Sequence, residues 1–293
     1  MQEDKQKDSF LLIGMVLSMF TWGLSWPSGK ILSSYGSAPN IAFCRFFVTF
    51  LGLLPILLLA REKMQLKKEG LPSLFLAGAS MSLYSFLFFQ GLRFGLPGAG
   101  GVLVTTLNPI IAYLIGLTLA KRWPSHNEAM GLSFGFVAGC ILLKIWGKVD
   151  IIFSAGNLYF LAASFTWAIL SKFTAKASRF GSPMSFSLWM YLICTVCMFA
   201  LTDKDALFTM LAHADSRFWW NLLFSGTITT SLATTFYFYA TSKIGAERAS
   251  SFIFLVPASA AFSSWIFIGE HIEWNTILGG TLGAIAVFMI NRK

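Results

Sequence analysis

The sequence has few charged residues, and those it has avoid its apolar segments. Only 12% of its 293 residues are charged, against roughly 25% in ordinary soluble domains. No Asp or Glu lies deep in an apolar segment, and His126, His213 and His271 are all near loops. A phosphate-binding Gly-Lys-Ser motif is also missing. These absences disfavour ATP hydrolysis, a buried carboxylate proton relay and an enzyme active site, so we expect no catalytic residues.

Cysteine is also scarce. Cys44, Cys140, Cys194 and Cys197 all lie in apolar runs. Cys194 and Cys197 have the spacing of a metal-binding pair, but no histidine or second pair lies nearby to complete a site. We interpret all four as small packing residues, and we expect neither a metal site nor a cofactor.

Long apolar runs dominate what remains, with 56% of the residues hydrophobic. A transmembrane helix needs about 20 mostly apolar residues. Ten segments qualify, roughly 9–31, 41–60, 71–92, 98–120, 128–146, 156–177, 184–202, 218–241, 247–268 and 272–290. The longest connection, about 203–217, is too short to fold alone. The sequence therefore predicts an all-α membrane protein with ten transmembrane helices.

The ten segments form two copies of one pattern. Phe20-Thr21-Trp22 recurs as Phe165-Thr166-Trp167, and Pro109 corresponds to Pro257. Each copy holds five segments, an odd number, so the second copy enters the bilayer from the opposite side. We predict two inverted five-helix repeats, residues 1–147 and 148–293. This architecture is typical of secondary transporters.

The distribution of positive charge predicts the orientation. With a cytoplasmic N-terminus, most Lys and Arg residues fall on the cytoplasmic face. The other face receives Lys30, Arg93, Lys144, Lys148, Lys204 and Arg217. The positive-inside rule then places both termini in the cytoplasm. The net charge of +9 thus indicates a multi-pass protein of the cell inner (plasma) membrane, with the lipid bilayer and not nucleic acid as partner.

The eighth segment is the most polar. Its hydroxyl-bearing residues are Thr227, Thr229, Thr230, Ser231, Thr234, Thr235, Tyr237, Tyr239 and Thr241. Any one of these hydroxyls could simply bond to its own helix. Hydroxyls on every face of the segment nevertheless indicate that at least one face is wet, because an unmet polar group in lipid costs several kcal/mol.

Other segments supply aromatic and polar residues at helical spacing. Trp22 and Trp167 occupy equivalent positions in the two repeats and could cap a cavity from opposite sides; ordinary helix packing is the alternative. Asn108 precedes Pro109, which frees a carbonyl. The residues predicted to line a substrate-binding chamber are Trp22, Tyr84, Phe88, Thr105, Asn108, Trp167, Thr230, Tyr237, Ser251 and Phe254.

Two further groups of residues are assigned structural roles. Gly131 and Gly135, and likewise Gly279 and Gly283, have the spacing that lets helix backbones touch. We therefore place the fifth and tenth segments outside the chamber. Lys30 and Lys144 can extend to the outer surface. Arg45, about one turn into the second segment, either holds helix ends together or meets a substrate carboxylate.

Several short motifs resemble one family. Trp22-Gly23 followed by Lys30, then Ala42-Phe43-Cys44-Arg45-Phe46, and later Leu255-Val256-Pro257 and Gly269-Glu270, resemble the EamA type of the drug/metabolite transporter superfamily. The resemblance implies a permease whose path is formed by helices 1, 3, 4, 6, 8 and 9. It also implies export or exchange of small metabolites, often amino acids. Lys121-Arg122 replaces the Gly-Glu expected after the fourth helix. The intramembrane glutamate that small multidrug members use for proton exchange has no counterpart here.

The sequence thus predicts an alternating-access exporter of a small neutral or zwitterionic solute. Aromatic or branched amino acids are favoured, because aromatic faces with hydroxyls suit such side chains. The alternative is a transporter of larger anionic solutes, such as nucleotide sugars or adenosyl compounds, for which only Lys30 or Arg45 could supply charge. Proton or solute coupling, and a monomer or a homodimer, stay open.

Overall fold

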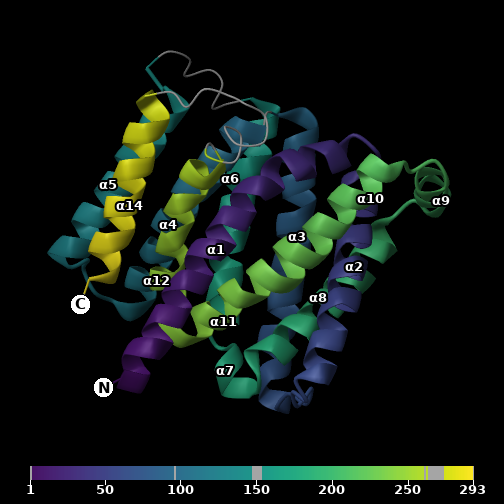
Figure 1. The fold of residues 1–293 in the computed structure, drawn as a ribbon, viewed down its shortest axis with the longest axis horizontal. Coiled ribbons are helices and arrows are strands. Elements are labelled where there is room, and N and C mark those ends of the chain that lie inside the picture. The colour runs from purple at the N-terminus through teal and green to yellow at the C-terminus, as the bar shows by residue number, and fades with distance from the viewer. Residues whose placement is uncertain (1, 96, 147–153, 261, 263–273, 293) are drawn as a thin grey trace.

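The computed structural model describes residues 2–95, 97–146, 154–260, 262 and 274–292 (Figure 1). Within these ranges all regular secondary structure is helical. Seven helices are long and apolar enough to cross a membrane, namely Ser9–Ser33, Ala38–Leu59, Lys68–Phe94, Gly100–Ala120, Ala155–Phe180, Pro183–Leu201 and Trp274–Asn291. The predicted all-α membrane protein is confirmed.

The first half contains five long helices. They are α1 (Gln2–Ser33), α2 (Ala38–Leu59), α3 (Leu71–Phe94, preceded by the short turn η1, Lys68–Gly70), α4 (Pro97–Ala120) and α5 (His126–Leu143). Their starts follow from the sequence. The Ser37 side chain accepts a hydrogen bond from the Asn40 backbone N–H ahead of α2, and Ser125 and Glu128 form a reciprocal capping box at α5.

The second half has more breaks. It contains α6 (Ala155–Thr174), α7 (Ala177–Phe180), α8 (Pro183–Leu201), α9 (Lys204–Ala212), α10 (Ser216–Leu223), η3 (Phe224–Thr234), α11 (Thr235–Ile244), α12 (Ala246–Ser251), η4 (Phe252–Leu255) and α14 (Trp274–Asn291). The predicted eighth segment is the continuous run of α10, η3 and α11 (Figure 1). The predicted ninth begins with α12 and η4 and stays helical through residue 260; its end and the start of the tenth lie outside the described residues.

The equivalent helices α1 and α6 run in opposite directions. Lys30, near the end of α1, donates a hydrogen bond from Nζ to the Gly95 carbonyl over 3.0 Å. Gly156, near the start of α6, packs on the same residue: a Cβ at Gly156 would lie 2.5 Å from Gly95 Cα. The end of one helix therefore meets the start of the other, as an inverted repeat requires. Both chain ends lie on the same side of the molecule (Figure 1).

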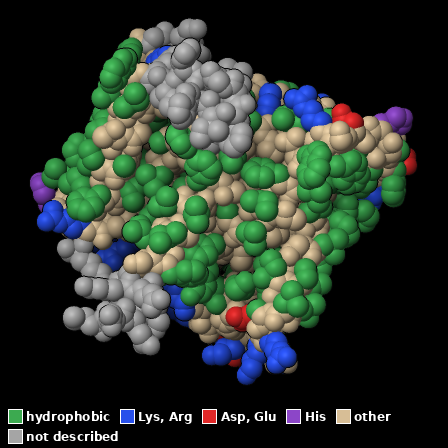
Figure 2. All heavy atoms as spheres, viewed as in Figure 1, with side chains coloured by type: hydrophobic (Ala, Val, Ile, Leu, Met, Phe, Trp, Pro, Cys, Tyr) green, Lys and Arg blue, Asp and Glu red, His purple; other side chains and the backbone are tan. Residues whose placement is uncertain are grey.

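The outer surface suits a bilayer. Hydrophobic side chains cover the middle of the face in Figure 2, and Lys and Arg side chains gather at opposite ends. Large apolar residues such as Leu51, Phe75 and Phe165 are about half exposed. Such exposure would be costly in water and is the ordinary condition of a lipid-facing side chain.

Helices of the two halves pack on each other throughout, with α3 on α6, α2 on α8 and α5 on α14. The α5–α14 contact is made by glycine. A Cβ at Gly131 would lie 2.6 Å from Ile290 Cγ1, and one at Gly279 would lie 2.5 Å from Leu142 Cγ and 3.2 Å from the Ala138 carbonyl oxygen. The close packing predicted for these glycines is confirmed.

We predict that Gly279→Leu destabilises the protein by about 1–3 kcal/mol, because the added side chain overpacks the α5–α14 contact. The measurement is the melting temperature of the detergent-purified protein, followed by size-exclusion chromatography after heating. Ala284→Leu is the matched control, since Ala284 is exposed on the same helix. Equal melting temperatures for the two variants would contradict this account of the packing.

A hydrogen-bonded aspartate joins α10 to the loop after α1. Tyr35 donates from its hydroxyl to Asp215 Oδ1 over 2.7 Å, and the Phe218 backbone N–H donates to the same oxygen over 2.9 Å. The Tyr35 bond, followed by the Phe218 bond, lowers the pKa of the exposed Asp215 carboxyl below its ordinary value. Asp215 therefore stabilises the fold in its charged form.

The stability that Asp215 contributes depends on pH in a definite direction. A lowered folded-state pKa gives stability that is present above the pKa of an unperturbed aspartate, about 3.9, and lost as the pH falls through the lower folded value. We predict that Asp215→Asn lowers the melting temperature at neutral pH, and that the difference from the unsubstituted protein shrinks below about pH 4. Asp205→Asn, an equal charge change at an exposed position of α9, serves as control. A difference independent of pH would refute the linkage.

Candidate functional site

The element η3 is a π-helical segment, in which backbone hydrogen bonds span five residues instead of four. Its hydroxyls meet the carbonyls of that wider turn: Thr230 Oγ1 donates to the Ser225 carbonyl over 2.7 Å, and Thr234 Oγ1 to the Thr229 carbonyl over 2.9 Å. Ser231 Oγ reaches across to the Thr49 carbonyl of α2 over 2.8 Å. Short π-helical segments often occur at functional sites.

Beside η3 lies a narrow cavity with a volume of about 50 Å³. That volume holds only a few water molecules. Both halves contribute to its wall, which consists of Trp22, Ser25, Trp26, Arg45, Met81, Tyr84, Phe88, Val104, Thr105, Asn108, Trp167, Thr229, Thr230, Thr234, Ile253 and Val256. No residue of α5 or α14 belongs to it, in agreement with the prediction that the fifth and tenth segments lie outside.

One group of aromatic rings bounds the cavity on the side of the chain termini. The Trp22 and Trp167 rings meet edge to face with centroids 5.0 Å apart, and Tyr84 lies 4.6 Å from Trp167. Tyr237 lies 5.0 Å from Trp22 and hydrogen-bonds Ser171 over 3.2 Å. We call these four rings the terminus-side cluster. The equivalent tryptophans of the two repeats thus touch each other.

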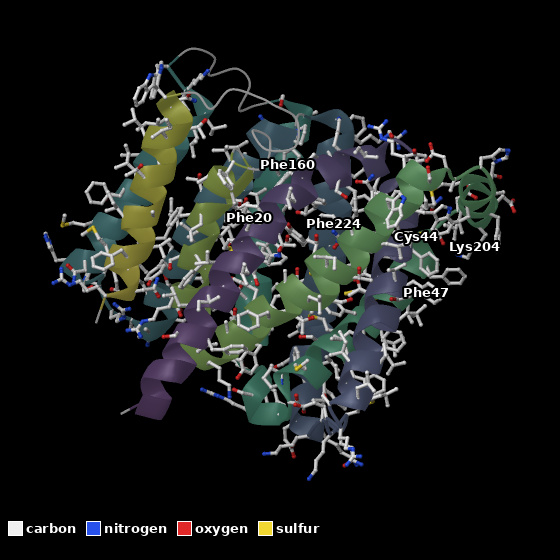
Figure 3. The ribbon with its side chains drawn as sticks, viewed as in Figure 1. Phe20, Cys44, Phe47, Phe160, Lys204 and Phe224 are labelled. Atoms are coloured by element: carbon white, nitrogen blue, oxygen red, sulfur yellow. The ribbon has the colours of Figure 1, made fainter. Side chains whose placement is uncertain are left out.

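A second group of rings bounds the other side. Trp26, one turn beyond Trp22 on α1, lies 5.0 Å from Phe88 and 5.6 Å from Phe160. We call Trp26, Phe88 and Phe160 the linker-side cluster. Phe160 is buried, and in Figure 3 it lies in the part of the molecule away from the N-terminus. The cavity therefore lies between two aromatic clusters.

The cavity wall carries unmet hydrogen-bonding capacity. Arg45 Nε, Asn108 Oδ1, Trp167 Nε1 and Thr229 Oγ1 are buried atoms without a hydrogen-bond partner. Asn108 Nδ2 makes one weak bond, over 3.5 Å, to the Ser164 carbonyl of α6. A buried polar atom without a partner costs about 1–3 kcal/mol. Four such atoms around one cavity indicate a place where a polar ligand or water would bind.

Arg45 lies deeper than the sequence predicted. Because α2 begins at Ala38, Arg45 is about two turns into the helix instead of one. The residue is only 6% exposed. Its Nη2 donates to Ser85 Oγ on α3 over 2.6 Å, and its guanidinium carbon lies 4.8 Å from the centre of the Phe89 ring. It therefore faces the cavity and also ties α2 to α3.

A larger groove is less suited to a polar ligand. It has a volume of about 700 Å³ and lies between α1, α2, α8 and the η3–α11 region. Phe10, Leu17 and Leu232, which line it, are about half exposed. A groove walled by exposed apolar side chains on a membrane-facing surface suits lipid tails. The narrow cavity beside η3 is therefore our candidate site.

Most residues predicted to line a chamber lie on this cavity: Trp22, Tyr84, Phe88, Thr105, Asn108, Trp167 and Thr230. Tyr237 stands behind them in the terminus-side cluster. Ser251 and Phe254 point elsewhere. Ser251 Oγ donates to the Arg248 carbonyl and accepts from Asn291 Nδ2 over 2.7 Å, and the Phe254 ring fills the space above Gly135.

The departures occur where α12 passes into η4, a short 3₁₀-helix with three residues per turn. Ile253, in η4, and Val256, just after it, line the cavity. Ser251 and Phe254 lie on the side of this segment that contacts Asn291 and Gly135. The π-helical turn of η3 likewise brings Thr229 to the wall together with Thr230 and Thr234.

Prediction from the sequence missed several lining residues: Ser25, Trp26, Arg45, Met81, Val104, Thr229, Thr234, Ile253 and Val256. A signal existed for some of them. Trp26 follows Trp22 by one helical turn, and Thr234 shares a stripe with Thr230. Lys30, an alternative source of charge, is not on the cavity wall; its Nζ donates to the Leu92 and Gly95 carbonyls.

Known proteins share the two-repeat sequence pattern along nearly the whole chain. The model of the EamA-like transporter family matches residues 9–144 and again residues 154–292. Uncharacterized transporter YoaV of Bacillus subtilis (strain 168) is 26% identical over 95% of this chain and 96% of its own length. A probable terminal-alkyne amino-acid exporter of Streptantibioticus cattleyicolor is 20% identical over 95% of this chain and 92% of its own.

A solved crystal structure shares the fold, with a TM-score of 0.65 at 14% sequence identity over 94% of this chain and 96% of that one. The family match is doubled and covers nearly all of the sequence, and the doubling agrees with the opposed directions of α1 and α6. On this evidence the chain belongs to the EamA-like transporter family.

Proposed function

We propose that this transporter exports small neutral or zwitterionic metabolites across the cell inner membrane by secondary-active alternating access, with aromatic or branched amino acids favoured. The substrate would bind in the cavity between the aromatic clusters, at the seam of two halves that we assign to residues 1–147 and 148–293. The observation that carries the proposal is one narrow cavity, walled by both halves, that combines aromatic rings with unpartnered polar atoms.

The chemistry of the wall supports this substrate class. Trp22, Tyr84 and Trp167 offer flat apolar faces, which suit an aromatic or branched side chain. Asn108 and Thr229 offer hydrogen bonds without adding charge. The relative named as a probable terminal-alkyne amino-acid exporter also supports amino-acid export.

The size of the cavity supports alternating access. Small-molecule sites usually measure about 300–1,000 Å³, whereas this cavity measures about 50 Å³. Rings must therefore part before an amino acid can enter. Separation of the terminus-side cluster would open the cavity on the side that the charge distribution assigns to the cytoplasm, and separation of the linker-side cluster would open it on the other.

Larger anionic solutes fit less well. Arg45 is the one cation among the described residues that line the cavity, and Lys30 is engaged with carbonyls at the end of α3. A nucleotide sugar carries two phosphate charges, so it would leave at least one of them unmet in a low-dielectric site. A solute with one carboxylate matches the single charge.

The proposal is tested by efflux from proteoliposomes. Purified protein is reconstituted, and counterflow of radiolabelled amino acids and of a nucleotide-sugar set is compared with that of protein-free vesicles. We expect counterflow of phenylalanine, tryptophan, leucine or isoleucine. Counterflow of the nucleotide sugars with none for any amino acid would overturn the amino-acid assignment.

We predict that Trp167→Ala lowers the efflux of aromatic amino acids at least about tenfold, because loss of ring contacts worth about 1.4 kcal/mol reduces binding by that factor. Trp167→Phe, which keeps a ring, should retain most of it. Trp220→Ala is the matched control, since Trp220 is 72% exposed on α10. Unchanged efflux in Trp167→Ala would show that this ring does not contact substrate.

A further inference from the structure

We propose that Arg45 binds the carboxylate of the transported solute. This inference rests on the proposed function and deepens it, because it names the group that the site recognises and the residue that recognises it. The carboxylate would lie toward α2 and α3, where the guanidinium meets the cavity.

The first reason is the burial of an unpaired charge. Arg45 is 6% exposed, and neither ion pair found in the described part of the chain, Arg122 with Glu128 or Lys172 with Glu247, involves it. A buried charge is costly unless it is paired. The rings of Phe46, Phe88 and Phe89, with centres 4.8–5.8 Å from its guanidinium carbon, offset only part of that cost.

The second reason is the open hydrogen-bonding capacity of the guanidinium. Arginine presents five N–H donors in a planar fork that matches a carboxylate. The one hydrogen bond that the structure gives this side chain runs from Nη2 to Ser85 Oγ over 2.6 Å, and Nε is buried without a partner. Because Arg45 lines the cavity, an anion there could accept from the remaining donors.

The rest of the wall suits the other end of an amino acid. Asn108 Oδ1 is an unpartnered acceptor on the same cavity, and the faces of Trp22 and Trp167 attract a cation. An ammonium group would therefore bind near α4, away from the guanidinium on α2. The described wall contains no carboxylate that would compete with the substrate for Arg45.

A purely structural Arg45 would tie α2 to α3 through Ser85 and have no effect on ligand preference. Ligand selectivity separates the two roles. The probes are three matched pairs: L-phenylalanine and L-phenylalaninamide, L-leucine and L-leucinamide, and 3-phenylpropionate and 3-phenylpropionamide. Binding to purified protein in nanodiscs is measured by ligand-induced thermal stabilisation. We expect the unsubstituted protein to prefer each acid over its amide by about 10- to 100-fold, the usual effect of a charge-assisted hydrogen bond.

The variants are Arg45→Met, Arg45→Lys and the control Arg93→Met, since Arg93 is exposed at the end of α3, off the cavity wall. Arg45 has no ion-pair partner among the described residues, so Arg45→Met strands no opposite charge and is expected to fold. It should bind each acid no better than its amide while still binding the amides. Arg45→Lys should keep part of the preference for acids, and Arg93→Met all of it.

The outcomes separate this inference from the proposed function. Acid preference that survives in Arg45→Met, or equal binding of acids and amides by the unsubstituted protein, overturns the role of Arg45 and leaves amino-acid export standing. Binding of 3-phenylpropionate without either amino acid, lost in Arg45→Met, supports Arg45 and overturns the amino-acid class. If none of the acids stabilises the unsubstituted protein, both proposals fail.

Discussion

The structure depends on one constraint: in a membrane, every polar group must find its partner inside the protein. The hydroxyls of η3 meet the carbonyls of a π-helical turn, Lys30 caps the last carbonyls of α3, and Ser231 reaches across to α2. Buried side-chain atoms without a partner occur elsewhere too, at Asn40, Ser82 and Gln90. Those of Arg45, Asn108, Trp167 and Thr229 differ in that they lie around one cavity. A site that binds and releases a polar solute has to keep such groups unsatisfied when it is empty.

The same constraint explains how the halves fit together. The inverted arrangement brings the end of α1 and the start of α6 to Gly95, and glycines let α5 and α14 approach at backbone distance. The α5–α14 contact lies off the cavity, whereas the cavity is bounded by aromatic rings. Aromatic contacts hold mainly by area and orientation. Parting the terminus-side cluster would also break the hydrogen bond from Trp22 Nε1 to Thr234 Oγ1, whose groups water entering the cavity would satisfy.

Much of the fold could be predicted from the sequence, because spans and repeats follow from hydrophobic length and from the equivalence of Trp22 and Trp167. The site was predicted in part, and the errors have local causes. Periodic reasoning failed in the ninth segment, where Ser251, at the end of α12, and Phe254, in the 3₁₀-helical η4, contact Asn291 and Gly135 instead of the cavity. Arg45 was placed too near the helix end because the cap at Ser37 starts α2 earlier than hydropathy alone indicates. Caps and non-α turns depend on tertiary contacts that a hydrophobic pattern does not encode.

A single buried cation has a further consequence for a carrier. When the cavity is empty, closing the two aromatic clusters around Arg45 confines an uncompensated charge in a low-dielectric space, and that raises the free energy of the closed form. An anion bound to the guanidinium removes this penalty. The closed form is then stabilised relative to the open forms by the difference between the anion's affinity for the closed form and its affinity for the open forms. If Arg45 binds the solute carboxylate, one residue both selects the solute and lowers the barrier to its passage. Solute exchange would then run faster than return of the empty carrier, with no separate coupling residue required.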